Sequence, residues 1–298
     1  MEINFKQMPS AMDIFSGDLT VDNMVMAMRF RFPEKKIIPG KTMIFLDEIQ
    51  ECQEAITSLK FWALDNRYDV IVSGSLLGID YKCASSYPVG YVDYLRMYGI
   101  DFEEFLWGMG ISDDMIKKLR DYFESRSVIP EAINSQMMSY YRQYIAIGGM
   151  PEAVQKYIDT KDFREVDRIQ RNLLQGYQYD IAHYATAEEK VKAEKCYLSL
   201  AKQLLDKENH KFQYLYKKGY QLYFYKNETS KKEIDVIIQQ DGKVVPIEVK
   251  GGNTRANSLK SLMRKNKDIC LGYKFVDGNI GVSEDGIITL PLYMIVFI

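Results

Sequence analysis

The sequence pattern that most restricts the fold is a strand, a helix and a second strand in the first quarter of the chain. Residues 43–46 form an unbroken apolar run that ends at Asp47 and Glu48, which is typical of a strand buried on both faces. Apolar residues then recur at helical spacing over residues 55–63, and a second short apolar run covers residues 70–72. A strand–helix–strand unit of this length predicts two parallel strands joined by a right-handed crossover.

Two carboxylates stand where the first of these strands ends. An apolar strand followed by Asp47 and Glu48 has the form of a Walker B motif, in which the aspartate helps to hold Mg²⁺ and the neighbouring acid polarises the attacking water. Ser73 ends the neighbouring strand at the same sheet edge, where it is placed to sense a γ-phosphate. The alternative is a buried strand followed by an acidic cap that starts the next helix.

The phosphate loop that normally accompanies such an edge is not found in the sequence. That loop needs Gly-x-x-x-x-Gly-Lys-Ser/Thr between a strand and a helix, so that backbone amides and a lysine surround the phosphates. Residues 40–42 (Gly-Lys-Thr) supply only its last three letters, position 35 is Lys35 instead of glycine, and the segment leads into a strand. We therefore expect an acidic sheet edge without the groups that hold a triphosphate.

The rest of the chain changes from helices to strands. Amphipathic stretches such as residues 114–126 and 163–179 predict a mostly helical middle. From about residue 221 the pattern is one of strands, and Asp241-Gly242 predicts a two-residue hairpin turn. With that turn Gln240 pairs with Lys243, and the register follows along both strands. One hairpin face is then wholly apolar, with Ile234 opposite Val249.

The other hairpin face carries charged residues. In the predicted register Asp235 lies across from Glu248, with Lys250 beside them. Opposed carboxylates destabilise a hairpin unless a cation lies between them. Asp235 followed by Glu248-x-Lys250 has the form of the PD-(D/E)XK nuclease signature, in which two acids hold Mg²⁺ and the lysine orients or activates the attacking water.

A basic segment follows the hairpin. Residues 251–267 contain no acid and carry five positive charges suited to a phosphate backbone, at Arg255, Lys260, Arg264, Lys265 and Lys267. This pattern predicts nucleic acid as a partner of the C-terminal domain. The alternative is a solvated hairpin face followed by a basic surface helix.

Composition narrows the protein class. Lys and Arg number 39 and Asp and Glu 41, for a net charge of -2, which excludes a globally basic nucleic-acid coat. Four scattered cysteines without a CxxC pair argue against a zinc framework or a disulfide scaffold and favour a reducing cytoplasm. The N-terminus has no secretory h-region, and the most apolar stretch, residues 287–298, is shorter than the roughly 20 residues of a membrane helix. We expect a soluble, cytoplasmic protein.

The chain resembles a prokaryotic family of AAA-type ATP-binding proteins. In that family a P-loop ATPase domain is fused to a C-terminal domain of unknown function that ends in a restriction-endonuclease-like fold. The matching stretches occur in the family's order and span nearly the whole chain; they are Phe45-Leu46-Asp47-Glu48-Ile49-Gln50, Ser73-Gly74-Ser75-Leu76-Leu77-Gly78, Ser86-Tyr87-Pro88-Val89-Gly90, Phe102-Glu103-Glu104-Phe105-Leu106-Trp107, Gly148-Gly149-Met150-Pro151-Glu152-Ala153-Val154, Glu233-Ile234-Asp235 and Ile247-Glu248-Val249-Lys250.

Two departures limit what the resemblance implies. In the family the Walker A loop precedes the segment that begins here with Glu2, and a longer middle separates segments like residues 207–209 and 222–225. The resemblance therefore implies a family member in which Asp47 would hold Mg²⁺ but which does not bind or hydrolyse ATP by itself. It also implies that Glu208 is the residue placed to supply the third acid of an endonuclease-like core.

We therefore expect an α/β chain in three parts. Residues 1–110 form an incomplete P-loop NTPase-type parallel sheet, residues 111–205 a helical connector and residues 206–298 a small endonuclease-like domain. The first alternative to an inactive ATPase relative is Mg²⁺- or Mn²⁺-dependent nucleic-acid binding or cleavage by the C-terminal domain. The second is a non-catalytic interaction module or degenerate gene product, which would self-associate through open sheet edges.

Overall fold

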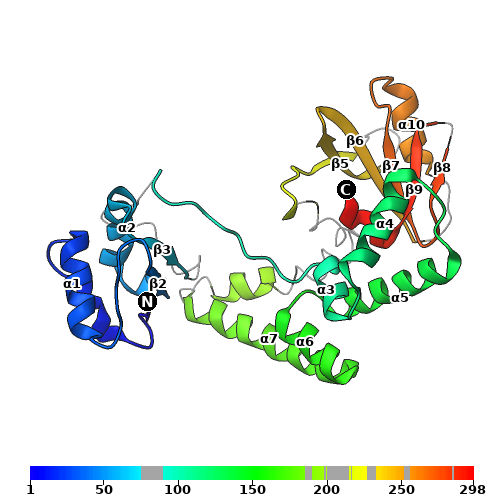
Figure 1. Cartoon of the computed structure of the whole chain (residues 1–298). Coiled ribbons are helices and arrows are strands. Elements are labelled where there is room, and N and C mark those ends of the chain that lie inside the picture. Colours follow the sequence, from blue (N-terminus) through cyan, green and yellow to red (C-terminus); the bar gives the residue numbers. More distant parts are fainter. Residues whose placement is uncertain are drawn as a thin grey trace. The chain divides into compact units, whose positions relative to one another are not determined.

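The structure, a computed structural model, divides into two compact units. These are Met1–Arg96 and Met97–Ile298 (Figure 1). The residues that it describes are 1–74, 90–184, 190–197, 199, 215, 217–226, 233–251, 256–283 and 285–298.

The first unit is a parallel three-stranded sheet with its helices. In space the strands follow the order β1 (Glu2–Asn4), β2 (Met43–Asp47) and β3 (Asp69–Val72). The remaining elements of the unit are the 3₁₀ turns η1 (Pro9–Phe15) and η2 (Ile49–Glu51) and the helices α1 (Val21–Arg31) and α2 (Gln53–Asp65). The predicted strand–helix–strand unit is thus confirmed as β2, α2 and β3, with its two strands parallel.

Only one face of this sheet is fully buried. Ile44 and Leu46 of β2 are inaccessible to solvent and belong to a core that includes apolar residues of α1 and α2. On the opposite face Met43 is 51% exposed and Ile71 of β3 is 47% exposed. The expectation that residues 43–46 are buried on both faces is therefore wrong, because the described helices of this unit pack against one side.

The second unit begins with helices. An aspartate, Asp101, caps the first of them by accepting a hydrogen bond from the Glu104 amide, while Glu104 accepts one from the Asp101 amide. The predicted amphipathic stretches correspond to α4 and to most of α7. The helices are α3 (Phe102–Gly108), α4 (Asp113–Ser125), α5 (Glu131–Ile147), α6 (Pro151–Thr160) and α7 (Phe163–Tyr184).

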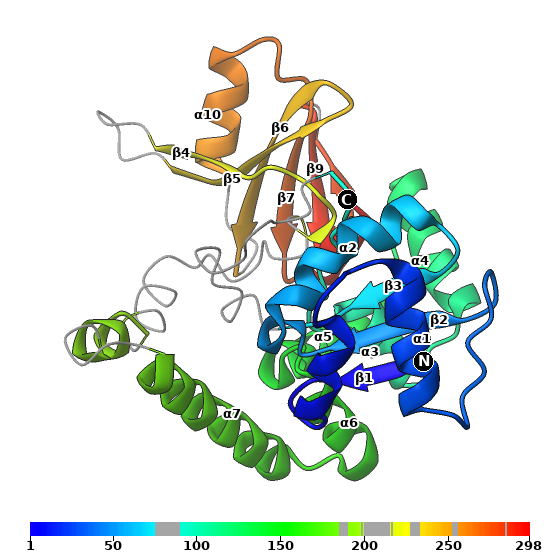
Figure 2. The same cartoon turned by 90° about the vertical axis from the view of Figure 1, so that its left-hand side faces the viewer.

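A mixed six-stranded sheet follows, in the spatial order β4-β5-β6-β7-β9-β8. Neighbours are antiparallel from β4 to β6 and parallel from β6 through β7 to β9. The connecting helix α10 lies against β5 and β6 (Figure 2). The elements are β4 (Tyr223–Lys226), β5 (Glu233–Gln240), β6 (Lys243–Lys250), α10 (Asn257–Lys265), β7 (Gly272–Val276), β8 (Gly281–Val282) and β9 (Ile287–Pro291).

The predicted hairpin register is confirmed over the first part of the hairpin. The β5–β6 ladder runs from Gln240 opposite Lys243 to Val236 opposite Ile247 and ends there. Asp241 and Gly242 form the turn, both with positive φ, as a type I′ turn requires.

Beyond that point β5 contains a bulge. Along β4, Tyr223 pairs with Ile237 but Tyr225 pairs with Ile234, so two steps on β4 match three on β5. The extra residue moves Ile234 into the small core beneath α10, away from the core that holds Val249. The expectation that these two residues share one apolar face is therefore wrong.

The helices and the mixed sheet share one core. The C-terminal apolar stretch forms the 3₁₀ turn η4 (Leu292–Phe297), which is buried among α3, α4, α5, β7 and β9. Asn279 donates to the Ile129 carbonyl at 2.8 Å and accepts from the Ile129 amide at 3.0 Å. Domain boundaries at residues 110 and 205 stay predictions.

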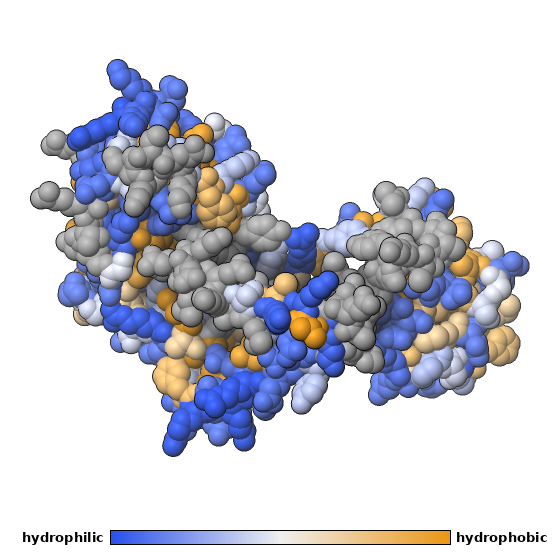
Figure 3. Space-filling view, turned by 180° about the vertical axis from the view of Figure 1, so that it is seen from behind, coloured by the Kyte–Doolittle hydropathy of each residue, from blue (hydrophilic) through white to orange (hydrophobic). Residues whose placement is uncertain are grey.

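On the face drawn in Figure 3, hydrophilic and hydrophobic residues are intermingled. Leu95 and Met97, which lie in a segment without helix or strand, are among the most exposed apolar residues of the described chain. None of the helices in the described ranges is long and apolar enough to cross a membrane.

Candidate functional site

Asp47 is the carboxylate on which the three strands of the first sheet converge. Its Oδ1 accepts hydrogen bonds from the hydroxyl of Ser73, just after β3, and from the Glu48 amide at 3.0 Å. Its Oδ2 accepts from Asn4 Nδ2, at the end of β1, at 2.6 Å. These side chains lie at the carboxyl edge of a parallel sheet, which is where ligands bind in open α/β folds.

These donors stabilise the charged form of Asp47. They lower the pKa of its carboxyl below the usual 3.8, with the Ser73 hydroxyl as the largest cause. The structure brings Asp47 and Ser73 together as the strand-end pattern predicts. Asn4 was missed, because a three-residue strand leaves no periodic signal in the sequence.

Glu48 is held by different groups. Its backbone is left-handed, with φ of 54°, a conformation that is uncommon for a non-glycine residue and is found more often at functional sites. Gln50 donates to its carboxylate and Lys6 Nζ lies 3.0 Å from Oε2. Both contacts lower the pKa of Glu48, that of Gln50 most. Sequence analysis did not single out Lys6.

The acids do not act as the cap of the following helix. The residue that precedes α2 is Cys52, and no side chain caps that helix. Glu48 precedes the short turn η2 and also makes no side-chain cap. The alternative interpretation of this segment as an acidic helix cap is therefore wrong.

The chemistry of this edge suits a magnesium ion that is carried by a nucleotide. Mg²⁺ in such sites takes most of its ligands from phosphates and water, so one protein carboxylate is enough. Asp47 fits that role, since ligating carboxylates are usually held by hydrogen bonds. Within the described ranges, no three His, Cys, Asp or Glu residues gather into a group that could hold a metal ion.

Residues 40–42, whose sequence Gly-Lys-Thr resembles the end of a phosphate loop, lie in a turn. Gly40 has φ of 68°, and the Thr42 hydroxyl accepts from the Ile38 amide at 2.9 Å. Lys41 is exposed, and the chain continues into β2 instead of a helix. The prediction that this segment is not a phosphate loop is confirmed.

In the second unit, Glu248 is a buried carboxylate. It is 1% exposed, and its Oε1 lies 2.9 Å from Lys250 Nζ. Its Oε2 accepts from the Leu259 amide, in the first turn of α10, at 3.4 Å. The alternative of a solvated hairpin face is therefore wrong for this residue, because α10 covers that side of β6.

Asp235 reaches the same strand in a way that the sequence did not predict. Its Oδ2 accepts from the Val249 amide at 2.6 Å, beyond the point where the β5–β6 ladder ends. The β5–β6 ladder does not pair Asp235 directly with Glu248. The expectation of two directly opposed carboxylates is thus corrected, although both residues contact neighbouring positions of one strand.

The basic segment after the hairpin forms an amphipathic helix where the structure describes it. Leu259, Leu262 and Met263 of α10 are buried. Lys260 forms an ion pair with Asp285 at 3.0 Å. Of the predicted basic residues, Lys260, Arg264 and Lys265 lie on α10 and Lys267 follows it, whereas Arg255 and the acid Glu208 lie outside the described residues.

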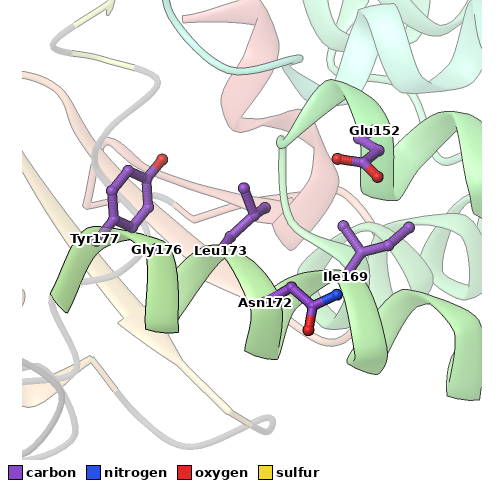
Figure 4. Close-up of a pocket in the computed structure, with 6 residues that line it drawn as sticks. All are labelled: Glu152, Ile169, Asn172, Leu173, Gly176 and Tyr177. Atoms are coloured by element: carbon purple, nitrogen blue, oxygen red, sulfur yellow. The ribbon is translucent and has the colours of Figure 1, made fainter. Parts of the chain in front are cut away.

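The second unit also has a shallow pocket between α6 and α7. It has a volume of about 280 Å³ and is lined by Glu152 of α6 and by residues of α7 (Figure 4). The residues from α7 are Ile169, Asn172, Leu173, Gly176 and Tyr177. One carboxylate, one amide and one phenol among apolar groups do not identify a reaction.

Comparison with known proteins identifies three regions. Residues 5–106 match the family model of an AAA domain. Residues 138–218 and 207–295 match models of domains of unknown function, DUF8612 and DUF4143. A search of curated proteins and a search of solved structures each found no match. The chain is therefore an AAA-type ATPase-like protein whose N-terminal AAA domain is followed by domains of unknown function.

Proposed function

We propose that Asp47, Glu48 and Ser73 form the nucleotide-facing edge of the AAA domain, and that a polypeptide of these 298 residues does not hold ATP on its own. In this proposal Asp47 would hold Mg²⁺, Glu48 would polarise water and Ser73 would sense the γ-phosphate. The observation that carries it is the convergence of three strand ends on the Asp47 carboxylate.

The predicted inactivity follows from how a triphosphate is bound. Most of the binding energy comes from backbone amides and a lysine that surround the phosphates. The 298 residues contain no Gly-x-x-x-x-Gly-Lys-Ser/Thr segment, and the nearest likeness ends in a turn before β2. Lys6, the cation next to the acids, is engaged by Glu48. The edge can therefore orient a magnesium ion and water but offers little to the phosphates.

A binding titration tests this proposal. We expect a fluorescent ATP analogue with Mg²⁺ to show no saturable binding to the 298-residue chain in the micromolar range. Asp69→Ala, at the opposite end of β3, is the matched control for Asp47→Ala. Saturable micromolar binding that Asp47→Ala abolishes and Asp69→Ala preserves would show the proposal to be wrong.

A second candidate function is metal-dependent binding or cleavage of nucleic acid by the C-terminal domain. A buried carboxylate beside a lysine, Glu248 with Lys250, is the specific observation that favours it, because buried charged groups are rare and are concentrated at functional sites. Asp235 and Glu248 would hold Mg²⁺ or Mn²⁺, and Lys250 would orient the attacking water. The order of two antiparallel pairs and then a parallel pair joined by α10 also supports an endonuclease-like fold.

Plasmid DNA with Mn²⁺ tests the second candidate. Cleavage by the wild-type chain should be lost in Glu248→Gln and retained in Glu233→Gln, at the exposed start of β5. The glutamine keeps the shape of the buried side chain, so that loss of folding does not imitate loss of chemistry. Absence of wild-type cleavage at every Mn²⁺ and Mg²⁺ concentration would rule this function out.

A further inference from the structure

The end of α1 and the loop that follows it form a basic patch on the first unit. Between residues 29 and 41 the chain has one acid, Glu34, and five basic residues, all of them exposed. The five residues that define the basic patch are Arg29, Arg31, Lys35, Lys36 and Lys41. The chain as a whole has a net charge of -2, so this excess of positive charge is local, and it attracts ligands of opposite charge.

The cations of the basic patch have no carboxylate bound to them in the described part of the chain. None of the five forms an ion pair there, whereas Arg67 of the same unit pairs with both Asp22 and Asp65. Arg29 donates to the Ile37 carbonyl at 2.7 Å and so holds the loop against the last turn of α1. The cations of the helix end and those of the loop are therefore kept together.

Large apolar side chains are exposed on the same part of α1. Phe30 is 83% exposed and Met26 is 54% exposed, and residues four apart are neighbours on one side of a helix. That side is opposite the buried one, which carries Met24 and Met28. In the loop Ile38 is 43% exposed. Exposed apolar groups beside cations are typical of a surface that contacts an anionic layer with an apolar interior.

These apolar side chains favour lipid over nucleic acid. Single-stranded nucleic acids bind by stacking successive bases on aromatic rings. The ring of Phe32 is already in contact with cations, because the charged groups of Arg31 and Lys35 lie 5.9 and 5.6 Å from its centroid. The exposed ring is that of Phe30, and its exposed neighbour Met26 has no ring. Such a pair suits the apolar layer of a membrane better than a row of bases.

We propose that the basic patch binds the anionic surface of a phospholipid membrane, with Phe30 and Met26 inserted below the headgroups. Acidic phospholipids attract clustered Lys and Arg side chains. Apolar side chains on a helix surface strengthen the attachment by entering the boundary between headgroups and acyl chains. This attachment involves neither Asp47 nor Glu248, so it is independent of the functions proposed above.

Co-sedimentation of the full chain with lipid vesicles tests the proposal. We expect binding to vesicles of phosphatidylserine and phosphatidylcholine in equal parts, and much weaker binding to pure phosphatidylcholine. Lys36→Gln should bind the mixed vesicles about fivefold more weakly, because a basic residue near an anionic surface contributes about 1 kcal/mol. Met26→Ser should bind about tenfold more weakly, since the apolar side chain is no longer buried in lipid.

Helix α4 of the second unit offers a matched control for each variant. Met115 is 55% exposed and Lys118 is exposed, and the first turn of this helix carries Asp113 and Asp114. Met115→Ser and Lys118→Gln make the same chemical changes outside the basic patch. We expect both to bind the mixed vesicles like wild type.

Phe30→Trp measures insertion directly. The fluorescence of this variant should be quenched by vesicles with brominated acyl chains beyond the quenching of wild type, whose tryptophans are Trp62 and Trp107. Absence of this additional quenching would overturn the proposal, as would equal vesicle binding by Lys36→Gln and wild type or binding that is independent of phosphatidylserine. Binding of an oligothymidylate that Lys36→Gln weakens, without binding to vesicles, would assign the basic patch to nucleic acid instead.

Discussion

Each acid of the two candidate sites is held by a donor from another part of the chain. Asp47 accepts from residues of β1 and from just after β3, Glu48 from Lys6, and Glu248 from the first turn of α10. A carboxylate held in this way keeps its charge and its orientation without a ligand. The same donors would support metal ligation, because they fix the direction of the free oxygen lone pairs.

We predict that Ser73→Ala raises the pKa of Asp47 toward 3.8. The Ser73 hydroxyl is the largest cause of the lowered pKa, and its removal leaves Asn4 and the Glu48 amide as donors. The pKa is measured by following the Asp47 side-chain carbon by NMR over a pH titration. Ser16→Ala is the matched control, because this exposed hydroxyl donates to the nearby Asp13 carbonyl and not to Asp47. An unchanged Asp47 titration would contradict the assigned hydrogen bond.

The same bond makes stability depend on pH. Because the folded pKa of Asp47 lies below the usual 3.8, the Ser73 bond contributes stability that is complete at pH values well above 3.8. That contribution is lost as the pH falls through the folded pKa. The difference between wild type and Ser73→Ala in urea unfolding should therefore be largest near neutral pH and shrink in acid.

The sequence identified the acids but not their partners. Asp47, Glu48 and Ser73 follow apolar runs, and strand ends of a parallel sheet meet at one edge. Lys6 could not be placed, because nothing local shows that β1 pairs with β2.

Gly99 and Gly149 of the second unit lie where two backbone segments approach each other closely. The Ile100 amide donates to the Gly149 carbonyl at 2.7 Å, where the chain enters α3 and α6. A Cβ atom on Gly149 would overlap the Ile100 carbonyl oxygen, and one on Gly99 would lie 2.8 Å from the Gly149 oxygen. Sequence analysis found Gly149 within one of the stretches that carry the family resemblance but could not show what it contacts.

We predict that Gly149→Ala lowers the free energy of unfolding by about 2–4 kcal/mol, because backbone on both sides must move. Gly176→Ala is the matched control, since Gly176 lies in α7 and, apart from its own helix backbone, no atom in the described part of the chain lies within 4 Å of the added Cβ. There alanine should stabilise the chain by about 0.5–1 kcal/mol through helix propensity. Urea unfolding measures both variants, and equal effects would refute the contact.

The bulge in β5 limits how much of the hairpin register could be predicted from the sequence. The Asp241-Gly242 turn correctly fixes the ladder as far as Val236 and Ile247. Pairing with β4 then requires an extra residue before Ile234. A turn determines only the strands that it joins, whereas the bulge depends on a third strand, and so the position of Asp235 could not be predicted from the hairpin.

We predict that Asn279→Ala lowers the free energy of unfolding by about 2–3 kcal/mol. Its side chain bonds both the amide and the carbonyl of Ile129, which is 1% exposed, so truncation leaves two buried backbone groups without partners. Asn172→Ala, at an exposed position of α7, should change stability by less than about 0.5 kcal/mol. Comparable losses in the two variants would argue against this contact between the helices and the sheet.

The two units of the chain differ in their hydrophobic cores. In the second unit the helices and the mixed sheet share one core, whereas in the first unit the core covers one face of the sheet. Residues 97–298 bury the C-terminal apolar stretch between helices and sheet, so that stretch serves packing. Among the described residues of the first unit, β1 and β3 are the outer strands of the sheet, and one sheet face carries exposed apolar residues such as Met43 and Ile71. Composition and patterning gave the α/β class and the order of the elements, but the extent of each core depends on contacts between distant segments.

The open face leads us to predict that the chain self-associates in solution. Parallel sheets are normally covered on both faces, and exposed edge strands tend to pair with other chains. Ile71 lies on the open face of edge strand β3, beside Phe45 of β2. Association would bury these apolar groups, and a charge at position 71 should prevent it, because a charge is costly to bury unpaired.

Sedimentation velocity over a range of concentrations checks this prediction. The wild-type chain should show concentration-dependent association, and Ile71→Glu should remain monomeric with the same unfolding transition. Met115→Glu is the control, because Met115 is 55% exposed on the solvated helix α4 of the other unit, and it should associate like wild type. A wild-type chain that stays monomeric at every concentration would contradict the prediction of self-association through the open face. If it also melts in one sharp transition, that result would argue against the interpretation of the chain as a degenerate, non-catalytic gene product. Such a result would require the half-buried apolar residues of β2 and β3 to be covered within a single chain.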